Sequence, residues 1–232
     1  MYESCDFNYS VFSHDYSLPL SEETCETKER ILLLATLAFA KYGFAAVSMR
    51  DLAKIMGLNQ SSIYNHFDSK EALWREVNDH AGNLYLLYFE HLNEQIAAAS
   101  SFEEVLETIF FEPKRLHNAF TSYAFTMVQS EQFRDQTAGK LFQETYMTYA
   151  IECLKDSFDK CVARGLVRKF DTRTVATIIL NAVFMGLQVQ VHHQLNHSYA
   201  FPFNPREMFV NLQKYILWSV TGGEGDTVGD AS

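Results

Sequence analysis

Short helical patterns near the N-terminus, each ended by a residue suited to a helix terminus, constrain this chain most. From Thr27 to Tyr42, apolar residues recur every three or four positions, and Gly43 follows where a helix would take a left-handed C-cap. Ser48 precedes a second pattern and has Asp51 three residues on, which is the arrangement of a capping box. These signals predict a first helix over this stretch and a second from 49 to about 56.

A tight turn and a short polar helix come next. Gly57 accepts the positive φ that such a turn requires, and Asn59 is a favourable N-cap for a third helix that we expect to reach about His66. Asp68 or Ser69 then caps a fourth helix, predicted to be a long rod by its apolar positions Leu73, Trp74, Val77, Leu84, Leu87 and Tyr88. Helices at these spacings predict a compact unit of three helices with a rod leaving it.

The rest of the chain is also predicted to be helical, because the alternation of apolar and polar residues that is typical of β-strands is scarce. Gly165 is expected to end one helix, Asp171 to cap the next, and Pro202 with Pro205 to mark the loop before the last. The patterns predict further helices near 102–112, 114–130, 138–164, 172–195 and 205–220. The fold class is therefore predicted to be all-α.

Changes in pattern divide the chain into four predicted parts. Before residue 27, aromatic, acidic and Ser residues occur without a sustained helical or strand periodicity. The C-terminal end is rich in Gly and Asp. We expect a flexible arm (1–26), a three-helix helix-turn-helix domain (27–77), a larger helical domain (78–221) and a disordered tail (222–232).

Charge is distributed unevenly along the 232 residues. The formal net charge is -10, which argues against indiscriminate binding to nucleic acids or anionic membranes. Residues 27–77 nevertheless hold seven Lys or Arg against five Asp or Glu. No segment reads as a secretory signal or as an apolar stretch long enough for a bilayer, so we expect a cytoplasmic protein without a membrane partner.

Cysteines and histidines give little indication of a metal site or of catalysis. Cys5, Cys25, Cys153 and Cys161 form no CxxC pair, so reduced thiols are expected, with no metal and no cofactor. His192, His193 and His197 are open to a metal-binding interpretation, although a surface cluster near a helix end explains them as well. Because no nucleophile, acid and base stand in a familiar arrangement, we expect no enzymatic activity.

The third predicted helix presents an unusual number of polar groups for its length. Ile63 and Phe67 would seat it on the core, which leaves the other side chains largely outward: Gln60, Ser61, Ser62, Tyr64, Asn65 and His66. The second helix of a helix-turn-helix enters the major groove, where such groups meet base edges. An ordinary solvated helix is the alternative reading of this stretch taken alone.

Several spaced motifs in 27–77 resemble the TetR family of transcriptional regulators. They are AFAKYGF (38–44), SMRDLA (48–53), GLNQSSIYNHF (57–67) and SKEAL (69–73), in this order. The resemblance implies that Ser48, Met49 and Arg50 meet phosphates or an adjacent base and that Lys70 faces the DNA backbone. It also implies that Gln60, Ser61 and Ser62 read bases and that Tyr64 and His66 hold phosphates. Asn65 is counted with the DNA-binding residues because it shares their outward surface.

Beyond residue 77 the resemblance is one of architecture. It implies a ligand cavity among the central helices and a homodimer formed by the last two, so that a small, partly apolar effector releases a repressor from a palindromic operator in double-stranded DNA. Activation would look identical in sequence. The candidate ligand residues, which core packing explains equally well, are Phe110, Phe120, Tyr123, Met127, Phe142, Tyr146 and Phe184. The candidate dimer residues are Ala176, Ile179, Val183, Leu187, Phe209, Leu212 and Ile216, with Gly186 permitting close helix approach.

Two other classes of function remain open at this point. One is a helical enzyme or metal-binding protein that retains a DNA-binding type of fold. The other is a protein-interaction module whose acidic C-terminal domain meets a partner and whose DNA contacts are incidental.

Overall fold

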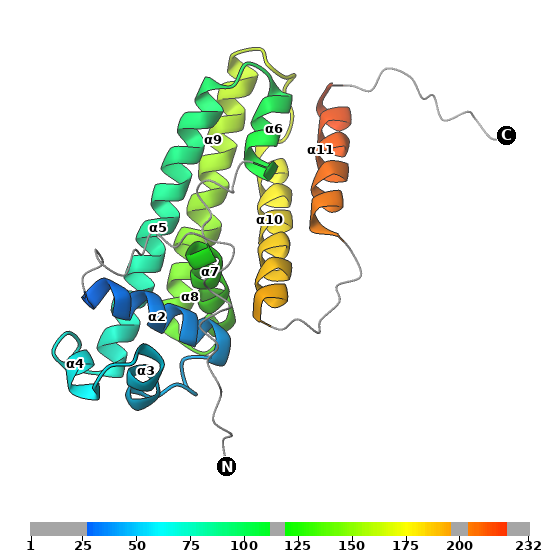
Figure 1. Ribbon diagram of the computed structural model, residues 1–232. Helices are drawn as coiled ribbons and strands as arrows, with labels where there is room; N and C mark the ends of the chain where they lie inside the picture. Colours follow the sequence, from blue (N-terminus) through cyan, green and yellow to red (C-terminus); the bar gives the residue numbers. More distant parts are fainter. Residues whose placement is uncertain (1–26, 112–118, 196–203, 222–232) are drawn as a thin grey trace.

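A computed structural model describes residues 27–111, 119–195 and 204–221, and within these ranges the chain is helical, without strands (Figure 1). The predicted all-α fold class is confirmed. The helices are α2 (Thr27–Tyr42), α3 (Met49–Met56), α4 (Gln60–Tyr64), α5 (Lys70–Ala98), α6 (Phe102–Phe111), α7 (Ala119–Glu131), α8 (Gln136–Leu141), the π-helix η2 (Phe142–Tyr149), α9 (Ala150–Ala163), α10 (Thr172–Leu195) and α11 (Pro205–Thr221). The predicted arm, the predicted tail and Pro202 lie outside the described residues.

Local chemistry fixes the ends of the first helices where the sequence predicts them. Ser48 Oγ accepts a hydrogen bond from the Asp51 amide at 3.2 Å, and the Asp51 carboxylate accepts one from the Ser48 amide at 3.0 Å. Both halves of the capping box are therefore present at the start of α3. Gly43 and Gly57 adopt φ of 81° and 64°, the left-handed region that closes α2 and α3.

The core of the three-helix unit is built from fully buried residues of α2, α3 and α4. Ile31 and Phe39 of α2 and Leu52 of α3 are each 0% exposed, as is Ile63 of α4. The Phe39 ring meets Trp74 of α5 edge to face at a centroid distance of 5.4 Å. The first turn and a half of α5 thus belongs to the same core.

The third helix is shorter than predicted. Asn59 holds the N-cap position with extended backbone, but its side chain makes no capping bond, and α4 ends at Tyr64 instead of His66. The His66 amide already bonds back three residues to the Ile63 carbonyl, so the chain tightens into a turn before α5. Ser69, one of the two predicted caps, accepts a bond from the Ala72 amide at 3.0 Å.

The rod predicted to leave the first unit is α5, with 29 residues and a length of about 44 Å at 1.5 Å per residue. It continues without a break through residue 77, where the domain boundary is predicted. In Figure 1, α5 runs alongside α9, and α10 lies beside α9 on the other side. A single helix is therefore shared by the three-helix unit and the larger bundle.

The single helix predicted over 138–164 is three consecutive segments. Asp135 caps α8 by accepting a bond from the Ala138 amide, and the chain then passes through η2 before α9 begins. A π-helix hydrogen-bonds over five residues instead of four, which shifts the face that its side chains present. Periodicity of 3.6 residues does not reveal such a segment.

The last two described helices, α10 and α11, pack closely. A Cβ on Gly186 would lie 2.5 Å from Phe209 Cζ, so any larger residue at this position would force the Phe209 ring to move. Arg168 binds the C-terminal end of α11, since its guanidinium donates to the carbonyls of Ser219 and Val220 at 2.6 and 2.7 Å.

The membrane prediction needs a correction at α10. The segment Thr172–Val189 is long and apolar enough to cross a bilayer by length and composition, contrary to the sequence-based expectation that no segment would qualify. Arg173 is the one charged residue in this stretch, and 39% of the stretch is buried inside the protein. A helix at the centre of a bundle passes the same test, and α10 packs against α7, α9 and α11.

Candidate nucleic-acid interface

The outward face of α4 carries most of the polar groups that the sequence predicts there. Ile63 and Phe67, at 0% and 2% exposure, anchor the helix to the core as expected. Gln60, Ser61, Asn65 and His66 are exposed, Tyr64 is 44% exposed, and Ser62 is half-buried. The side chains predicted to meet DNA are thus gathered on one short surface element.

The start of α3 offers backbone donors next to that element. The Met49 side chain is buried, so this residue can contribute only its amide, as the resemblance implies. The amides of Met49 and Arg50 lie in the first helical turn, where no acceptor is available within the helix. Such amides, with the positive end of the helix dipole, bind anions such as phosphates.

The hydroxyl and the amide of Ser48 are already hydrogen-bonded within the protein, which leaves this residue few groups for contact with DNA. Its hydroxyl donates to Asp51 Oδ2 at 2.5 Å while accepting from the Asp51 amide, and its own amide donates to the same carboxylate. These bonds, followed by the nearby charges of Arg50 and Lys54, lower the pKa of Asp51. Ser48 therefore positions the start of α3 and has its own groups already occupied.

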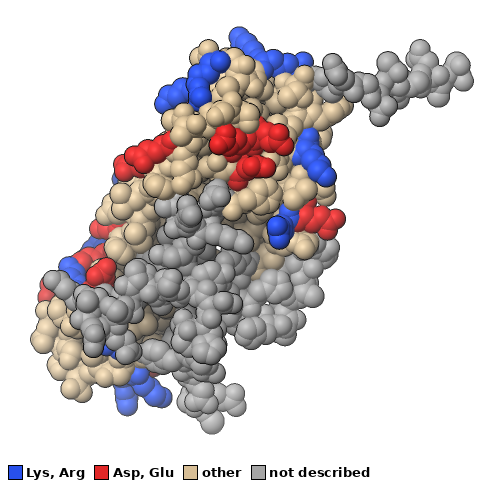
Figure 2. Space-filling model, turned by 45° about the horizontal axis from the view of Figure 1, so that its top comes forward, with Lys and Arg blue, Asp and Glu red and all other residues tan. Residues whose placement is uncertain are grey.

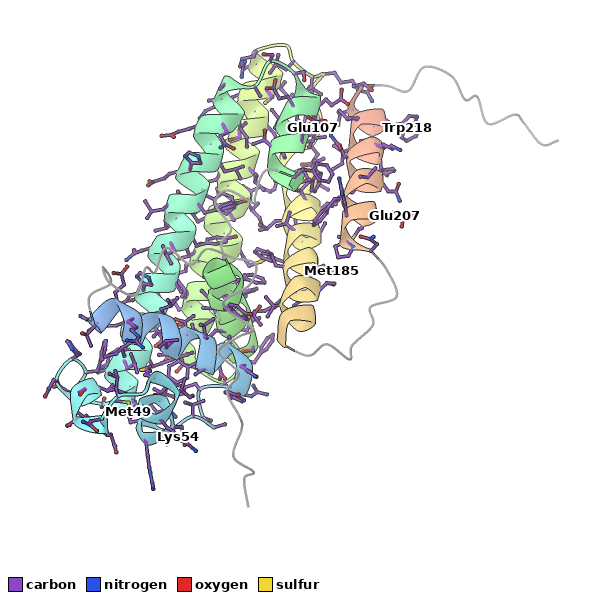
Figure 3. All side chains as sticks on the ribbon, in the orientation of Figure 1. Met49, Lys54, Glu107, Met185, Glu207 and Trp218 are labelled. Atoms are coloured by element: carbon purple, nitrogen blue, oxygen red, sulfur yellow. The ribbon has the colours of Figure 1, made fainter. Side chains whose placement is uncertain are left out.

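Lys54 is a basic residue that sequence reasoning missed. It lies four residues after Arg50, so both exposed side chains share a face of α3. Figure 3 shows Lys54 extending from α3 away from the body of the molecule. In Figure 2, Lys and Arg side chains project at the end where α3 and α4 lie, and most acidic side chains visible in that view lie elsewhere. The spacing of four residues between Arg50 and Lys54 is the sequence signal that could have identified Lys54.

Lys70, at the start of α5, packs instead of extending freely. Its Nζ lies 4.2 Å from the centroid of the Phe44 ring, a cation–π distance. Partial burial lowers the pKa of Lys70, although nearby Glu71, Glu131 and Asp51 act in the opposite direction. The residue is half-buried and holds the α2–α3 turn against α5.

A buried carboxylate joins the larger bundle to the three-helix unit. Glu131, the last residue of α7, is 5% exposed and accepts a hydrogen bond from the Phe44 amide at 3.0 Å. A Cβ at Gly43 would lie 3.3 Å from the same carboxylate. Since α7 also lies along α2, it bears directly on the turn that precedes α3.

A small apolar cavity of about 20 Å³, roughly the space of one water molecule, lies between α5, α6, α9 and α10. Of the predicted ligand residues, Phe184 lines it, and five others are buried in the surrounding core without lining it: Phe110, Tyr123, Met127, Phe142 and Tyr146. The side chain of Phe120 lies outside the described residues. The other lining residues were not among the predicted ligand residues. Four come from α5 (Tyr85, Tyr88, Phe89 and Leu92), four from α10 (Ile179, Leu180, Val183 and Leu187), and one each from α6 and α9 (Ile109 and Leu154).

The predicted dimer residues mostly face the core of their own subunit. Ala176 and Ile179 are 0% exposed, Ile216 is 3% and Leu187 is 8%, while Val183, Phe209 and Leu212 are half-buried against the same core. The four buried side chains leave little surface for a second copy, whereas the three half-buried ones keep part of theirs. The large apolar side chains exposed on these two helices are Ile178, Met185, Tyr215 and Trp218, of which Figure 3 labels Met185 and Trp218.

Among residues 27–111, 119–195 and 204–221, no group of three or more His, Cys, Asp or Glu side chains is arranged to hold a metal ion. The side chains of His192, His193 and His197 lie outside the described part, as do Cys5 and Cys25. Cys161 is buried, which raises the pKa of its thiol, and Cys153 is half-buried.

Known proteins resemble this chain in sequence and in fold. Residues 31–77 match the sequence model of the family described as bacterial regulatory proteins, tetR family. The uncharacterized HTH-type transcriptional regulator YerO of Bacillus subtilis is 30% identical over 128 residues, which cover 53% of this chain and 44% of YerO. The HTH-type transcriptional repressor KstR2 of Rhodococcus jostii is 28% identical over 97 residues, covering 41% and 48%. The match therefore spans about half the length of these two relatives.

The structural likeness extends over most of the chain. The TetR family transcriptional regulator PfmR of Thermus thermophilus superposes with a TM-score of 0.57 at 20% identity, covering 87% of this chain and all of PfmR. At this identity the likeness concerns the fold, which includes the larger bundle as well as the N-terminal unit.

Proposed function

We propose that this chain, which belongs to the TetR family of bacterial regulatory proteins, is a transcriptional repressor that binds a palindromic operator as a homodimer. Such a repressor acts in the cytoplasm, where the chromosome lies. It recognises a DNA duplex through α3 and α4, and this function needs no enzymatic step.

One observation carries the proposal, namely the polar outward face of α4 beside the cationic face of α3. Ile63 fixes α4 to the core, so its exposed amides and hydroxyls are presented on a rigid support. Arg50 and Lys54, with the first-turn amides of α3, supply positive charge next to them. Base edges in a major groove and the flanking phosphates are the partners that match these two sets of groups.

A second copy is proposed to pack on the outer faces of α10 and α11. Ile178 and Met185 lie seven residues apart on one face of α10, and Tyr215 and Trp218 lie three apart on α11. Exposed apolar side chains of this size on neighbouring helices favour burial against a partner, and Tyr and Trp are frequent anchors of interfaces. In a two-fold dimer the recognition helices would meet successive major-groove faces about 34–36 Å apart.

Release of DNA by a small molecule is proposed to act through α5 and α7. The cavity is walled by α5, the same rod that begins inside the DNA-proximal core at Leu73 and Trp74. A ligand that shifts α5 or α7 by a small amount would change the separation of the two recognition helices. A coupling free energy of about 1–3 kcal/mol is enough for such regulation.

Selection of bound fragments from random double-stranded DNA tests this function. The expected result is an inverted repeat whose half-sites lie about one helical turn apart, recovered by the wild-type chain and by Gln143→Ala, an exposed glutamine of η2. Double substitution of Arg50 and Gln60 by Ala should prevent enrichment. Recovery of no preferred duplex by folded wild-type protein would contradict the proposal.

A further inference from the structure

The buried face shared by α8, η2 and α9 has a spacing that a continuous α-helix does not keep. Every fourth residue along it is buried, with exposures from 0% to 8%: Ala138, Phe142, Tyr146, Ala150, Leu154 and Phe158. An α-helix has 3.6 residues per turn, so each step of four residues turns about 40° too far, and five steps turn about 200° too far. A continuous α-helix would therefore carry the last of these residues to the face opposite the first.

The π-helix η2 removes part of this drift. The backbone stays helical where η2 joins α8 and α9, with φ and ψ of -57° and -44° at Leu141 and of -59° and -45° at Tyr149. Because the hydrogen bonds of a π-helix span five residues, a step of four falls short of a full turn there, and the drift reverses. The three segments thus form one irregular helix whose buried face stays turned toward the core.

Two tyrosines tie η2 to α5, each through the main chain of the other helix. The Tyr85 hydroxyl donates a hydrogen bond to the Tyr146 carbonyl at 3.3 Å, and the Tyr146 hydroxyl donates one to the Ala81 carbonyl at 3.4 Å. The two rings stack with centroids 4.1 Å apart. Burial raises the pKa of both tyrosines above the ordinary value, so both hydroxyls keep their protons and remain donors.

The bond from Tyr85 acts on the backbone of the π-helix itself. The Tyr146 carbonyl lies near the middle of η2, and a side chain that bonds into the main-chain ladder is a known cause of helix irregularity. Gly82 of α5 leaves room for this close approach, since a Cβ there would lie 2.9 Å from Leu141 Cδ1 at the end of α8. The π-helix is therefore supported by contacts from a different element of the fold.

A change in the hydrogen bonding of η2 would reach the turn before α3. Because α9 packs along α10, the change would turn α8. The α8 backbone lies close to the end of α7, since a Cβ at Gly139 would lie 2.8 Å from the Gln132 carbonyl oxygen. The preceding residue is Glu131, whose carboxylate accepts the hydrogen bond of the Phe44 amide.

We infer that Tyr85 and Tyr146 form a latch that keeps η2 a π-helix, and that opening this latch converts η2 to an α-helix and turns α8. The effect on DNA rests on the proposed function, whereas the effect on η2 rests on the contacts of the two tyrosines alone. With the latch closed, Glu131 holds the turn before α3. With the latch open, α8 displaces the end of α7, and the recognition surface loses this support.

The double substitution Tyr85→Phe/Tyr146→Phe tests the latch, because it removes both hydroxyls and keeps both rings. The crystal structure of this variant should show main-chain hydrogen bonds over four residues, instead of five, across 142–149. Tyr88→Phe removes the hydroxyl of another buried tyrosine of α5 and should keep the π-helix. A double variant whose η2 matches that of the wild type overturns the inference.

Operator affinity and a rescue by deletion test the coupling to α3. The double variant should bind the selected operator about fivefold or more weakly than the wild type. Thr148 is an exposed residue of η2, and its deletion removes the extra residue that distinguishes a π-helix from an α-helix. Without it, α8 and α9 should join through an α-helix in their original orientation, so the double variant lacking Thr148 should regain the wild-type affinity.

Two outcomes contradict the coupling, with folding of each variant checked by circular dichroism. One is a folded double variant that binds the operator as the wild type does. The other is a folded deletion variant that does not regain affinity, since a general loss of packing would not be repaired by removing a further residue.

The crystallographic and DNA-binding results keep this inference apart from the proposed function. A wild-type chain that selects no operator, while its double variant converts η2 to an α-helix, would sink the proposed function and leave the latch standing. Selection of an operator by a chain whose double variant keeps the π-helix would do the reverse.

Discussion

Individual side chains of α3 and α4 differ in what they can offer a duplex. Arg50 and Lys54 carry full charges on exposed side chains, while Gln60 and Asn65 present amides that both donate and accept. Charge contacts with phosphates give affinity that falls with salt, and amide contacts with base edges give sequence preference. Substitutions in the two classes should therefore have separable effects.

Lys54→Ala should weaken binding to every duplex by a similar factor. Each phosphate contact contributes about 0.9 to the slope of log affinity against log salt, so loss of one such contact should reduce the slope by about 0.9. Fluorescence anisotropy at several salt concentrations measures both quantities. Lys169→Ala, an exposed lysine on the segment between α9 and α10, is the matched control and should behave as the wild type. An unchanged slope in Lys54→Ala would remove Lys54 from the interface.

Gln60→Ala should change which operators are preferred. A bidentate contact between an amide and a base discriminates against the wrong base by about 1–3 kcal/mol, and that discrimination should disappear at one position of each half-site. Competition between the selected operator and single-base variants measures the effect. A uniform loss over all variants would instead mean that Gln60 contacts phosphate, and an unchanged profile would mean that it contacts neither.

At the scale of elements, helices whose ends are fixed by their own residues could be predicted with their bounds. The ranges 27–42, 49–56 and 172–195 agree with α2, α3 and α10, because Gly43, the Ser48–Asp51 box and Asp171 act on backbone groups a few residues away. The end of α4 and the π-helix η2 could not be predicted. Both depend on how the chain must turn to meet elements distant in sequence.

Glu131 connects the end of α7 to the turn between α2 and α3, which is far away in the sequence. Glu131→Ala should therefore lower the free energy of unfolding. Removal of the carboxylate leaves the Phe44 amide without its acceptor, which costs about 1–3 kcal/mol in the free energy of unfolding. Glu131→Gln keeps an acceptor oxygen and should lose less. Chemical denaturation followed by circular dichroism measures both, with the exposed Glu103→Ala as control. Equal stability of Glu131→Ala and wild type would show that the contact contributes nothing.

At the scale of the whole molecule, the sequence indicates which residues turn inward but not which of them meet. Phe142 and Tyr146 were as plausible for a ligand site as Tyr85 and Phe89, yet the first pair fills the core beside α7 and the second lines the cavity. A void is the remainder after all side chains have packed, so it depends on every neighbouring element at once. The same limit applies to the predicted dimer residues of α10 and α11, because their apolar pattern does not separate side chains that pack within the subunit from those that would meet a second copy.

The outer face gives the last prediction, which concerns assembly. Trp218 is 62% exposed in the single chain, so Trp218→Glu should leave the stability of the subunit nearly unchanged. In a dimer the same change would bury an unpaired carboxylate at the interface, and sedimentation velocity at micromolar concentration should then find monomers. Loss of one half of the dimer should reduce operator affinity to that of a single half-site. Leu87→Glu, an equally exposed position on α5, controls for the added charge. If Trp218→Glu sediments as the wild-type dimer, the second copy must bind through a different face, because a two-fold interface would double the buried charge.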